Sequence, residues 1–231
     1  MLKSAEMVDY EIFLNERKIL YQNGIDVHDK NNYSNLNQNK IELCMKKYNA
    51  IHQRKRRYRD RVLKWVWWLK NIKHGQDYEL VLIMLSFNDE VLKSTTKDTR
   101  RKYVRRYLQK YCYHYLANID FSPKQREHYH VLALVEKNRK LANTWKWKMD
   151  VRKVRLDNNS IKKTFNYVMK VVNHAFKLGT RCESIIYDRN KKSLDIEWIV
   201  DSIYDKEYTM FKDLFNNELE EIYSQQSEIK R

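Results

Sequence analysis

The stretch REHYHVLALVEK (residues 126–137) places two histidines at the start of a run of apolar residues. Side chains alternate between the two faces of a strand, so His128 and His130 are predicted to share one face while Tyr129 points to the other. Beyond the histidines both faces are apolar, which is typical of a central strand. The stretch therefore predicts a buried strand with two neighbouring imidazoles at its open end.

A histidine pair with this spacing has two interpretations. Both rings can bind one metal ion, or the spacing can be chance, with each ring satisfied by local hydrogen bonds. Asp120 favours the metal, because it lies eight residues before His128 on a neighbouring predicted strand, where pairing would bring it to the same place. Two imidazoles and a carboxylate suit Mn²⁺ or Mg²⁺ and leave coordination positions open for phosphate oxygens. Glu127 and Glu136 are the rival carboxylates.

The remaining sequence predicts an α+β fold, in which an antiparallel sheet is backed by helices. Hydrophobic periodicity separates the helices from the strands, and cap and turn residues mark their ends. The predicted elements are helices at 4–21, 41–72, 97–116 and 160–179, strands at 78–89, 117–121, 128–136, 145–149, 151–156 and 184–188, and an acidic helix from about 201 to the C-terminus.

Charge is distributed unevenly along a chain whose net charge is +16. The first 193 residues carry 42 basic and 20 acidic side chains, whereas the rest carries four and ten. A surface this positive favours nucleic acid as the partner, with an anionic membrane surface as the weaker alternative. The basic segments 54–64 and 100–110 are expected to contact a phosphate backbone. The expected organisation is a basic helical extension (1–75), an α+β domain that contains the histidine pair (76–193) and an acidic helical tail (194–231).

Several classes of protein are excluded by what the sequence lacks. Its apolar runs, such as Leu80–Leu85, are far shorter than the ~20 residues of a membrane-spanning helix, and its N-terminus has no secretory pattern. Cys44, Cys112 and Cys182 are widely spaced and odd in number, so we expect reduced thiols in the cytoplasm. Three distant glycines cannot form a phosphate-binding loop.

A tyrosine and a lysine on the last core helix form the second candidate constellation. Tyr167 and Lys170 are three residues apart and therefore share a helix face, and His174 lies one turn further on. A tyrosine can act as a covalent nucleophile, and a lysine can stabilise its phenolate or a phosphate. The same pair is also common on basic helices with no catalytic role.

Taken in order, these segments resemble the HUH endonucleases, specifically the rolling-circle replication initiators of small plasmids and single-stranded DNA phages. LIMLSFNDE (82–90) resembles the first family motif, EHYHVLALV (127–135) the His-hydrophobe-His motif, and YVMK (167–170) the Tyr-x-x-Lys motif. The resemblance covers about residues 78–190. It implies a sheet of the ferredoxin or RNA-recognition-motif type.

The resemblance also implies roles for individual residues. His128, His130 and Asp120 would bind Mn²⁺ or Mg²⁺, Tyr167 would be the nucleophile, and Lys170 would support it. The enzyme would nick single-stranded DNA at a replication origin, keep the 5′ phosphate on its tyrosine, and leave a 3′ hydroxyl as primer. Its partners would be origin DNA and a host helicase and polymerase, in the cytoplasm of a bacterial cell.

Three alternatives remain open from the sequence. A relaxase or single-strand transposase would keep the chemistry and change the biological process. A non-catalytic DNA-binding regulator would need neither the tyrosine nor the metal. An RNA-binding module would present an exposed aromatic sheet face and would not depend on metal.

Overall fold

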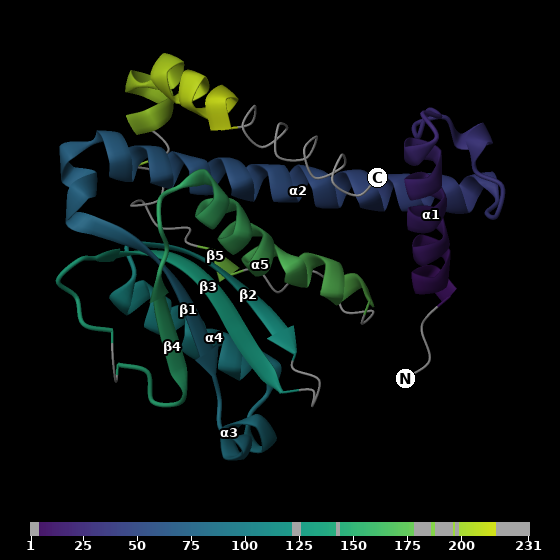
Figure 1. Cartoon of the computed structure of the whole chain (residues 1–231). Helices are drawn as coiled ribbons and strands as arrows, with labels where there is room; N and C mark the ends of the chain where they lie inside the picture. Colours follow the sequence, from purple (N-terminus) through teal and green to yellow (C-terminus); the bar gives the residue numbers. More distant parts are fainter. Residues whose placement is uncertain are drawn as a thin grey trace. The chain divides into compact units, whose positions relative to one another are not determined.

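The computed structural model describes residues 5–121, 126–141, 144–177, 186–187, 196 and 199–215. Its α+β class, an antiparallel sheet with several helices, is the class that the sequence predicts (Figure 1). The bounds of its elements are α1 (Ala5–Gln22), η1 (Lys30–Asn32), α2 (Gln38–Asn71), η2 (Lys73–Asp77), β1 (Tyr78–Ser86), α3 (Asp89–Ser94), α4 (Lys97–Tyr111), β2 (His114–Phe121), β3 (Glu127–Glu136), β4 (Met149–Lys153), α5 (Asn158–Lys177) and β5 (Ile186–Tyr187).

The chain is divided into two compact units, and one boundary between them falls within the long helix α2. The first unit takes in the chain up to Tyr58 and the end of α5 from Val172, and the second takes in residues 59–171 and the segments after 184. In the first unit α1 packs through Phe13, which is fully buried and stacks on Tyr33 with 5.1 Å between ring centroids. The predicted boundaries at residues 75 and 193 stay predictions.

The second unit contains the whole sheet, in the strand order β4-β1-β3-β2-β5 with antiparallel neighbours. β3 lies in the centre, as its two apolar faces predict. The register places Asp120 of β2 and Ser86 of β1 directly opposite His128 of β3. The ends of three strands therefore meet at the two histidines.

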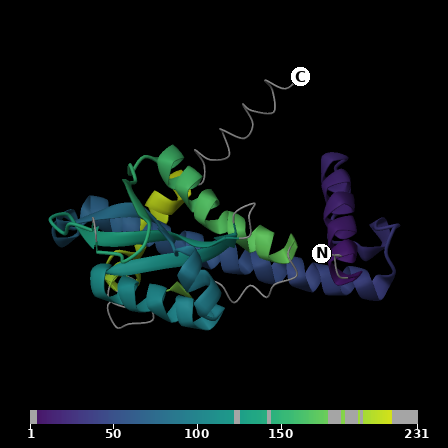
Figure 2. The same cartoon turned by 90° about the horizontal axis from the view of Figure 1, so that it is seen from below.

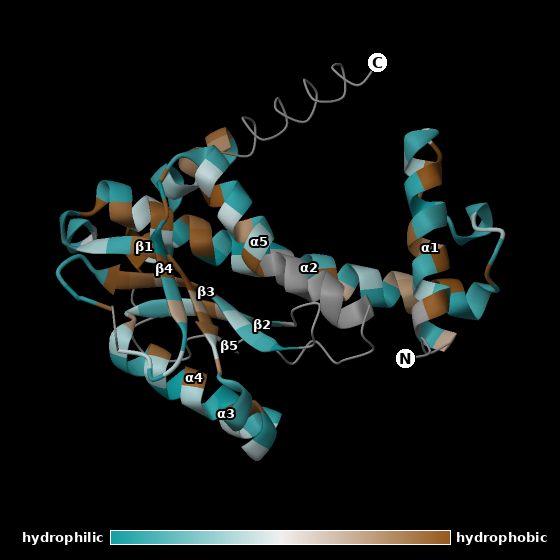
Figure 3. Ribbon diagram, turned by 60° about the horizontal axis from the view of Figure 1, so that its bottom comes forward, coloured by the Kyte–Doolittle hydropathy of each residue, from teal (hydrophilic) through white to brown (hydrophobic). Residues whose placement is uncertain are grey.

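Helices cover both faces of this sheet: α4 lies on one face and α5 on the other (Figure 2). The face toward α4 forms a continuous core with Val104 and Leu108, both fully buried, against Val131 and Ala133 of β3. The central strands are mostly apolar, whereas α4 presents many polar residues to the outside (Figure 3). This separation is the amphipathic pattern that drives a helix onto a sheet.

The predicted helix 97–116 is wrong at its end, because α4 stops at Tyr111 and β2 begins at His114, before the predicted strand start at 117. The backbone N–H of Cys112 bonds to Leu108 and caps the helix, and that of Tyr113 bonds to Leu134 of β3. Aromatic and apolar residues in YCYHYL fit a helix or a strand equally well locally. Pairing with the central strand decides between them.

The predicted strand at 145–149 is also wrong, and α3 was not anticipated. Residues 145–147 bend across the end of β1, where the Trp145 indole donates to the Ser86 carbonyl (3.1 Å) and the Ser86 N–H donates to the Lys148 carbonyl (2.9 Å). The next strand, β4, starts at Met149 and ends at Lys153, earlier than the predicted strand 151–156 at both ends. α3 begins where the Asn88 side chain accepts from the Val91 N–H.

The described part of the acidic tail packs on the second half of α2. Lys64 pairs with Asp201 at 2.6 Å, and Asp60 pairs with Lys212 at 2.8 Å. Burial raises the pKa of Asp60, but hydrogen bonds from Lys212 and Tyr208 outweigh it, so its pKa lies below its ordinary value. Of the tail beyond residue 215 nothing is described, and among the described residues no helix is long and apolar enough to cross a membrane.

Candidate metal centre

The β2–β3 pair brings three metal-ligating side chains together. The Nε2 atoms of His128 and His130 lie 3.1 Å apart, and Oδ2 of Asp120 lies 3.8 Å from the first and 3.5 Å from the second. One ligand atom from each residue lies within 4.8 Å of the other two, and this is a possible metal-binding triad. The prediction that strand pairing joins Asp120 to the histidines is confirmed.

The hydrogen bonds of His128 prepare its ring for a metal. Its Nδ1 lies 3.2 Å from the backbone carbonyl of Arg126, which can only accept, so Nδ1 is the donor in this bond and Nε2 is the nitrogen that faces the triad. A backbone carbonyl on the second nitrogen is a common way of orienting a metal-binding histidine. In His130, Nδ1 is buried and has no hydrogen-bond partner in the part of the chain that the structure describes.

Distances within the triad fit a small hard cation. Ligands about 2.1 Å from an octahedral ion lie about 3 Å from one another on adjacent vertices, and the separations of 3.1, 3.5 and 3.8 Å need only small side-chain movements to reach this. His130 is buried, whereas the side chains of His128 and Asp120 are each 17 % exposed. Solvent therefore reaches the triad at His128 and Asp120, and the protein encloses it at His130.

The rival carboxylates do not reach this site. Glu127 lies on the opposite face of β3, where its Oε2 is 2.7 Å from the Arg100 guanidinium and its Oε1 accepts from the Tyr129 hydroxyl at 2.9 Å. Glu136 is paired with Tyr78 at the far end of β1. Asp120 is therefore the carboxylate that the structure supplies to the histidines.

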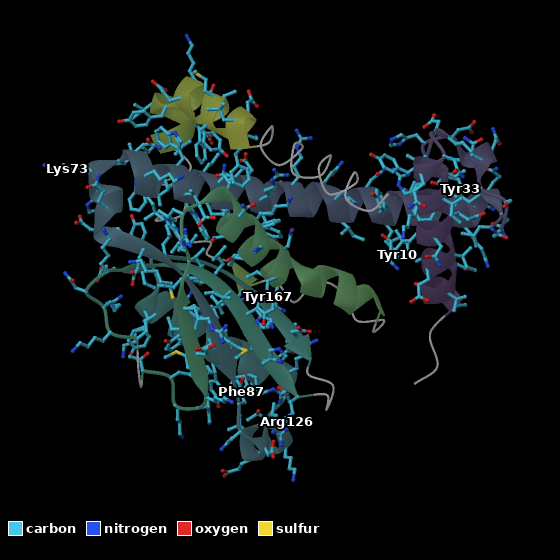
Figure 4. All side chains as sticks on the ribbon, viewed as in Figure 1. Tyr10, Tyr33, Lys73, Phe87, Arg126 and Tyr167 are labelled. Atoms are coloured by element: carbon cyan, nitrogen blue, oxygen red, sulfur yellow. The ribbon has the colours of Figure 1, made fainter. Side chains whose placement is uncertain are left out.

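Tyr167 projects from α5 toward the sheet and reaches the triad (Figure 4). Its ring lies 4.4 Å from the His130 ring between centroids, in an edge-to-face arrangement, and the side chain is 44 % exposed. Partial burial raises the pKa of Tyr167, the Asp120 carboxylate raises it further, and Arg152 opposes both. A phenol of raised pKa needs nearby positive charge before it can act as a nucleophile.

The predicted partners of Tyr167 on its own helix are only partly described. The backbones of Lys170 and His174 belong to α5, as the capped helix pattern predicts. Their side chains lie outside the described part of the structure, so their roles stay predictions.

Asp150 and Arg152 on the edge strand β4 were missed by sequence reasoning. The register places Asp150 opposite Met84, which itself lies opposite His130, so all three side chains share one sheet face. Arg152 pairs with Asp150 at 2.8 Å and acts electrostatically on Tyr167. In the sequence, only the cationic segment VRKVR (151–155) draws attention to this strand. Its position beside the histidines depends on the pairing of β4 with β1 and of β1 with β3, which the sequence does not show.

Not every residue of the predicted basic segments is available to DNA. Arg100 is buried in its pair with Glu127, and the Lys64 side chain is only 11 % exposed between Asp60 and Asp201. Trp67 and Trp68, beside the first segment, are also buried. Contacts with a phosphate backbone would therefore come from the exposed cations of these helices.

Comparison with known proteins finds no matching family model, no matching curated protein and no matching solved structure.

Proposed function

We propose that this protein is a metal-dependent endonuclease that nicks and rejoins single-stranded DNA through a tyrosine, as a rolling-circle replication initiator of the HUH type. The observation that carries the proposal is the edge-to-face contact of Tyr167 with His130, itself part of the Asp120–His128–His130 triad. A nucleophilic side chain beside a two-histidine, one-carboxylate triad is suited to phosphoryl transfer to a protein side chain.

Asp120, His128 and His130 would hold Mn²⁺ or Mg²⁺ through one carboxylate oxygen and two Nε2 atoms. The bound ion would polarise the scissile phosphate and stabilise the negative charge that develops on its oxygens. The protein's own part is to orient the ligands: the Arg126 carbonyl sets the His128 tautomer, and the sheet register fixes Asp120 opposite His128.

In the reaction, the Tyr167 phenolic oxygen attacks the phosphorus in line with the 3′ oxygen. A new bond joins tyrosine to the 5′ phosphate, and the bond from phosphorus to the 3′ oxygen breaks. The phenolic proton passes to solvent, which reaches the partly exposed ring, and the leaving 3′ oxygen takes up a proton. Because one phosphodiester is exchanged for another, no nucleotide is hydrolysed, and attack by a 3′ hydroxyl reverses the step.

The proposed partners follow from this chemistry and from the charge. A chain with net charge +16 suits a polyanionic substrate. The freed 3′ hydroxyl would prime a host polymerase in a bacterial cytoplasm, with a host helicase to open the duplex. The RNA-binding alternative needs an exposed aromatic sheet face, and helices on both sheet faces argue against it (Figure 2).

The test combines purified full-length protein, Mn²⁺ and a tiled set of end-labelled single-stranded oligonucleotides from the DNA surrounding its own gene. A denaturing gel would show a metal-dependent covalent protein–DNA band for the wild type and none for Tyr167→Phe. Tyr21→Phe is the matched control, because Tyr21 is 78 % exposed and lies outside the unit that contains the site.

Each result has a distinct meaning. A band that persists in Tyr167→Phe would move the nucleophile to another residue. DNA binding with no covalent band under any metal would favour the non-catalytic regulator, and a covalent band on transfer-origin or transposon-end DNA alone would favour a relaxase or transposase.

A further inference from the structure

A buried asparagine connects the strand beside the histidines to the helix of the nucleophile. Asn118 of β2 is fully buried, and its Nδ2 donates to the backbone carbonyl of Val168 in α5 at 2.5 Å. Val168 is fully buried as well. The bond therefore forms in an environment without water, where a directed hydrogen bond is strong and its loss is expensive.

Both ends of this bond lie next to the site. In the sheet register Asn118 is directly opposite His130, and Asp120 follows it by two residues on the same face of β2. Val168 follows Tyr167 in the chain. A single side chain thus connects the position opposite a metal-ligating histidine with the peptide unit beside the nucleophile.

The hydrogen bond from Asn118 gives the packing of α5 on the sheet a fixed direction, which apolar contacts do not provide. α5 lies on the sheet through buried apolar residues such as Ile161 and Val168, and this kind of contact is non-directional. A helix held only in this way can rotate or slide slightly without losing buried area. A backbone carbonyl has two lone pairs, so that of Val168 can accept from Asn118 and also keep its hydrogen bond within α5. The bond from Asn118 therefore limits both the rotation and the sliding of α5 on the sheet.

We propose that Asn118 is a positioning residue, which holds α5 so that the Tyr167 ring lies against His130. The contact does not depend on the protein's activity, but its catalytic consequence rests on the proposed function. Asn118 touches neither the reacting atoms nor the metal in this assignment. It acts through Tyr167.

The direct test is ¹⁹F NMR of the full-length, metal-free protein with 3-fluorotyrosine incorporated at position 167. Asn118→Leu keeps the branching at Cγ and removes the donor, and Asn118→Ser is a second, smaller variant whose hydroxyl is too short to reach Val168. Ile119→Ala is the matched control: Ile119 is the next residue of β2, buried on the opposite face toward α4, so it destabilises the sheet without touching α5.

In both Asn118 variants the ¹⁹F resonance is expected to move toward its position in urea, because the ring leaves His130. Ile119→Ala should lower the unfolding midpoint and leave the resonance in place. In the joining assay, the Asn118 variants should lose at least about tenfold in single-turnover rate, since small displacements of a nucleophile are this costly. Their affinities for Mn²⁺ and for single-stranded DNA should stay within about twofold of wild type.

The outcomes separate the two proposals. An unchanged ¹⁹F resonance in folded Asn118→Leu and Asn118→Ser would overturn the positioning role, whatever the activity. A displaced resonance in a protein that never joins DNA would uphold the positioning role and overturn the proposed function. A resonance displaced equally in Ile119→Ala would also overturn the assignment, because general loosening would then explain the effect.

Discussion

The two faces of β3 carry polar clusters at the same end of the strand, yet the clusters differ in charge balance. On the face toward α4, Glu127 has its own cation, Arg100, and a hydrogen bond from Tyr129. On the face toward α5, Asp120 lies beside the two imidazoles of His128 and His130. The first group, Arg100, Glu127 and Tyr129, is named the balanced cluster because it contains a carboxylate and a guanidinium. The second group, Asp120, His128 and His130, is a possible metal-binding triad, and its side of β3 is named the metal face.

This difference in composition predicts that the two clusters contribute differently to stability. Both are buried or partly buried, and both contain a carboxylate. In the metal-free protein, we expect disruption of the balanced cluster to cost more stability, because removal of one ion-pair partner leaves the other charge buried. The triad should give its stability only when a metal binds, because the ligands alone gain little from one another.

The largest expected effect comes from breaking the balanced cluster. Glu127→Ala leaves the Arg100 guanidinium buried without its partner, and we expect a loss of roughly 3–5 kcal/mol in the free energy of unfolding. Urea unfolding at pH 7 measures it. Glu136→Ala is the matched control, since Glu136 is an exposed carboxylate at the other end of the same strand. A loss no greater than the control's would mean that the pair is not truly buried in solution.

The second effect should appear only on the metal face. Saturation of the wild type with Mn²⁺ at about 100 times its dissociation constant should raise its unfolding free energy by about 2.7 kcal/mol, and Asp120→Asn should abolish most of this gain. Urea titrations with and without Mn²⁺ measure both. Glu127→Gln tests the contrast, and it should retain the Mn²⁺-dependent gain. Equal stabilisation of Asp120→Asn would place the metal elsewhere.

A third, smaller effect concerns the pH dependence of the balanced cluster. Burial, reinforced by the Glu127 charge, raises the pKa of Tyr129 above its ordinary value near 10. The neutral phenol therefore stabilises the fold below about pH 10, and this contribution is lost as the pH rises further.

Tyr129→Phe removes one buried hydrogen bond and should cost about 1 kcal/mol at pH 7. Above pH 10 the wild type should lose stability faster than the variant, so the difference between them shrinks. Parallel urea unfolding of both proteins between pH 7 and 11 measures this. A difference that stays constant with pH would show that Tyr129 does not titrate with unfolding.

The smallest effect is expected from the exposed ion pair that adjoins both clusters. Arg126 and Asp89 lie 2.9 Å apart, but their side chains are 60 % and 58 % exposed, so solvent screens the pair. Asp89→Ala should change the unfolding free energy by no more than about 0.5 kcal/mol. If Asp89→Ala lowers the unfolding free energy nearly as much as Glu127→Ala does, burial does not explain the difference between the two ion pairs.

Much of the metal face was predictable because its determinants are local. The alternation of His128, Tyr129 and His130 assigns the two faces, and the eight-residue separation from Asp120 fits two adjacent strands. The capped pattern around Tyr167 likewise predicts a helix. These inferences need only periodicity and short-range pairing.

The remaining features depend on contacts between distant segments. Nothing near Arg100 in the sequence indicates Glu127 as its partner, and a basic helix usually exposes its arginines. Asn118 lies between the apolar residues Ala117 and Ile119 of β2, which suggests a buried hydrogen bond but does not identify Val168, fifty residues later, as its partner. The end of α4 was misjudged because the pairing of β2 with β3 overrides local helix propensity.

All three candidate metal ligands lie within eleven consecutive positions, from Asp120 to His130, whereas Tyr167 follows much later. Contacts between nearby residues form quickly, since little chain entropy is lost in closing them. During synthesis, β1, β2 and β3 leave the ribosome before α5 does. The chain order therefore sets an order of assembly: Asp120, His128 and His130 can come together first, and α5 then packs Tyr167 against them.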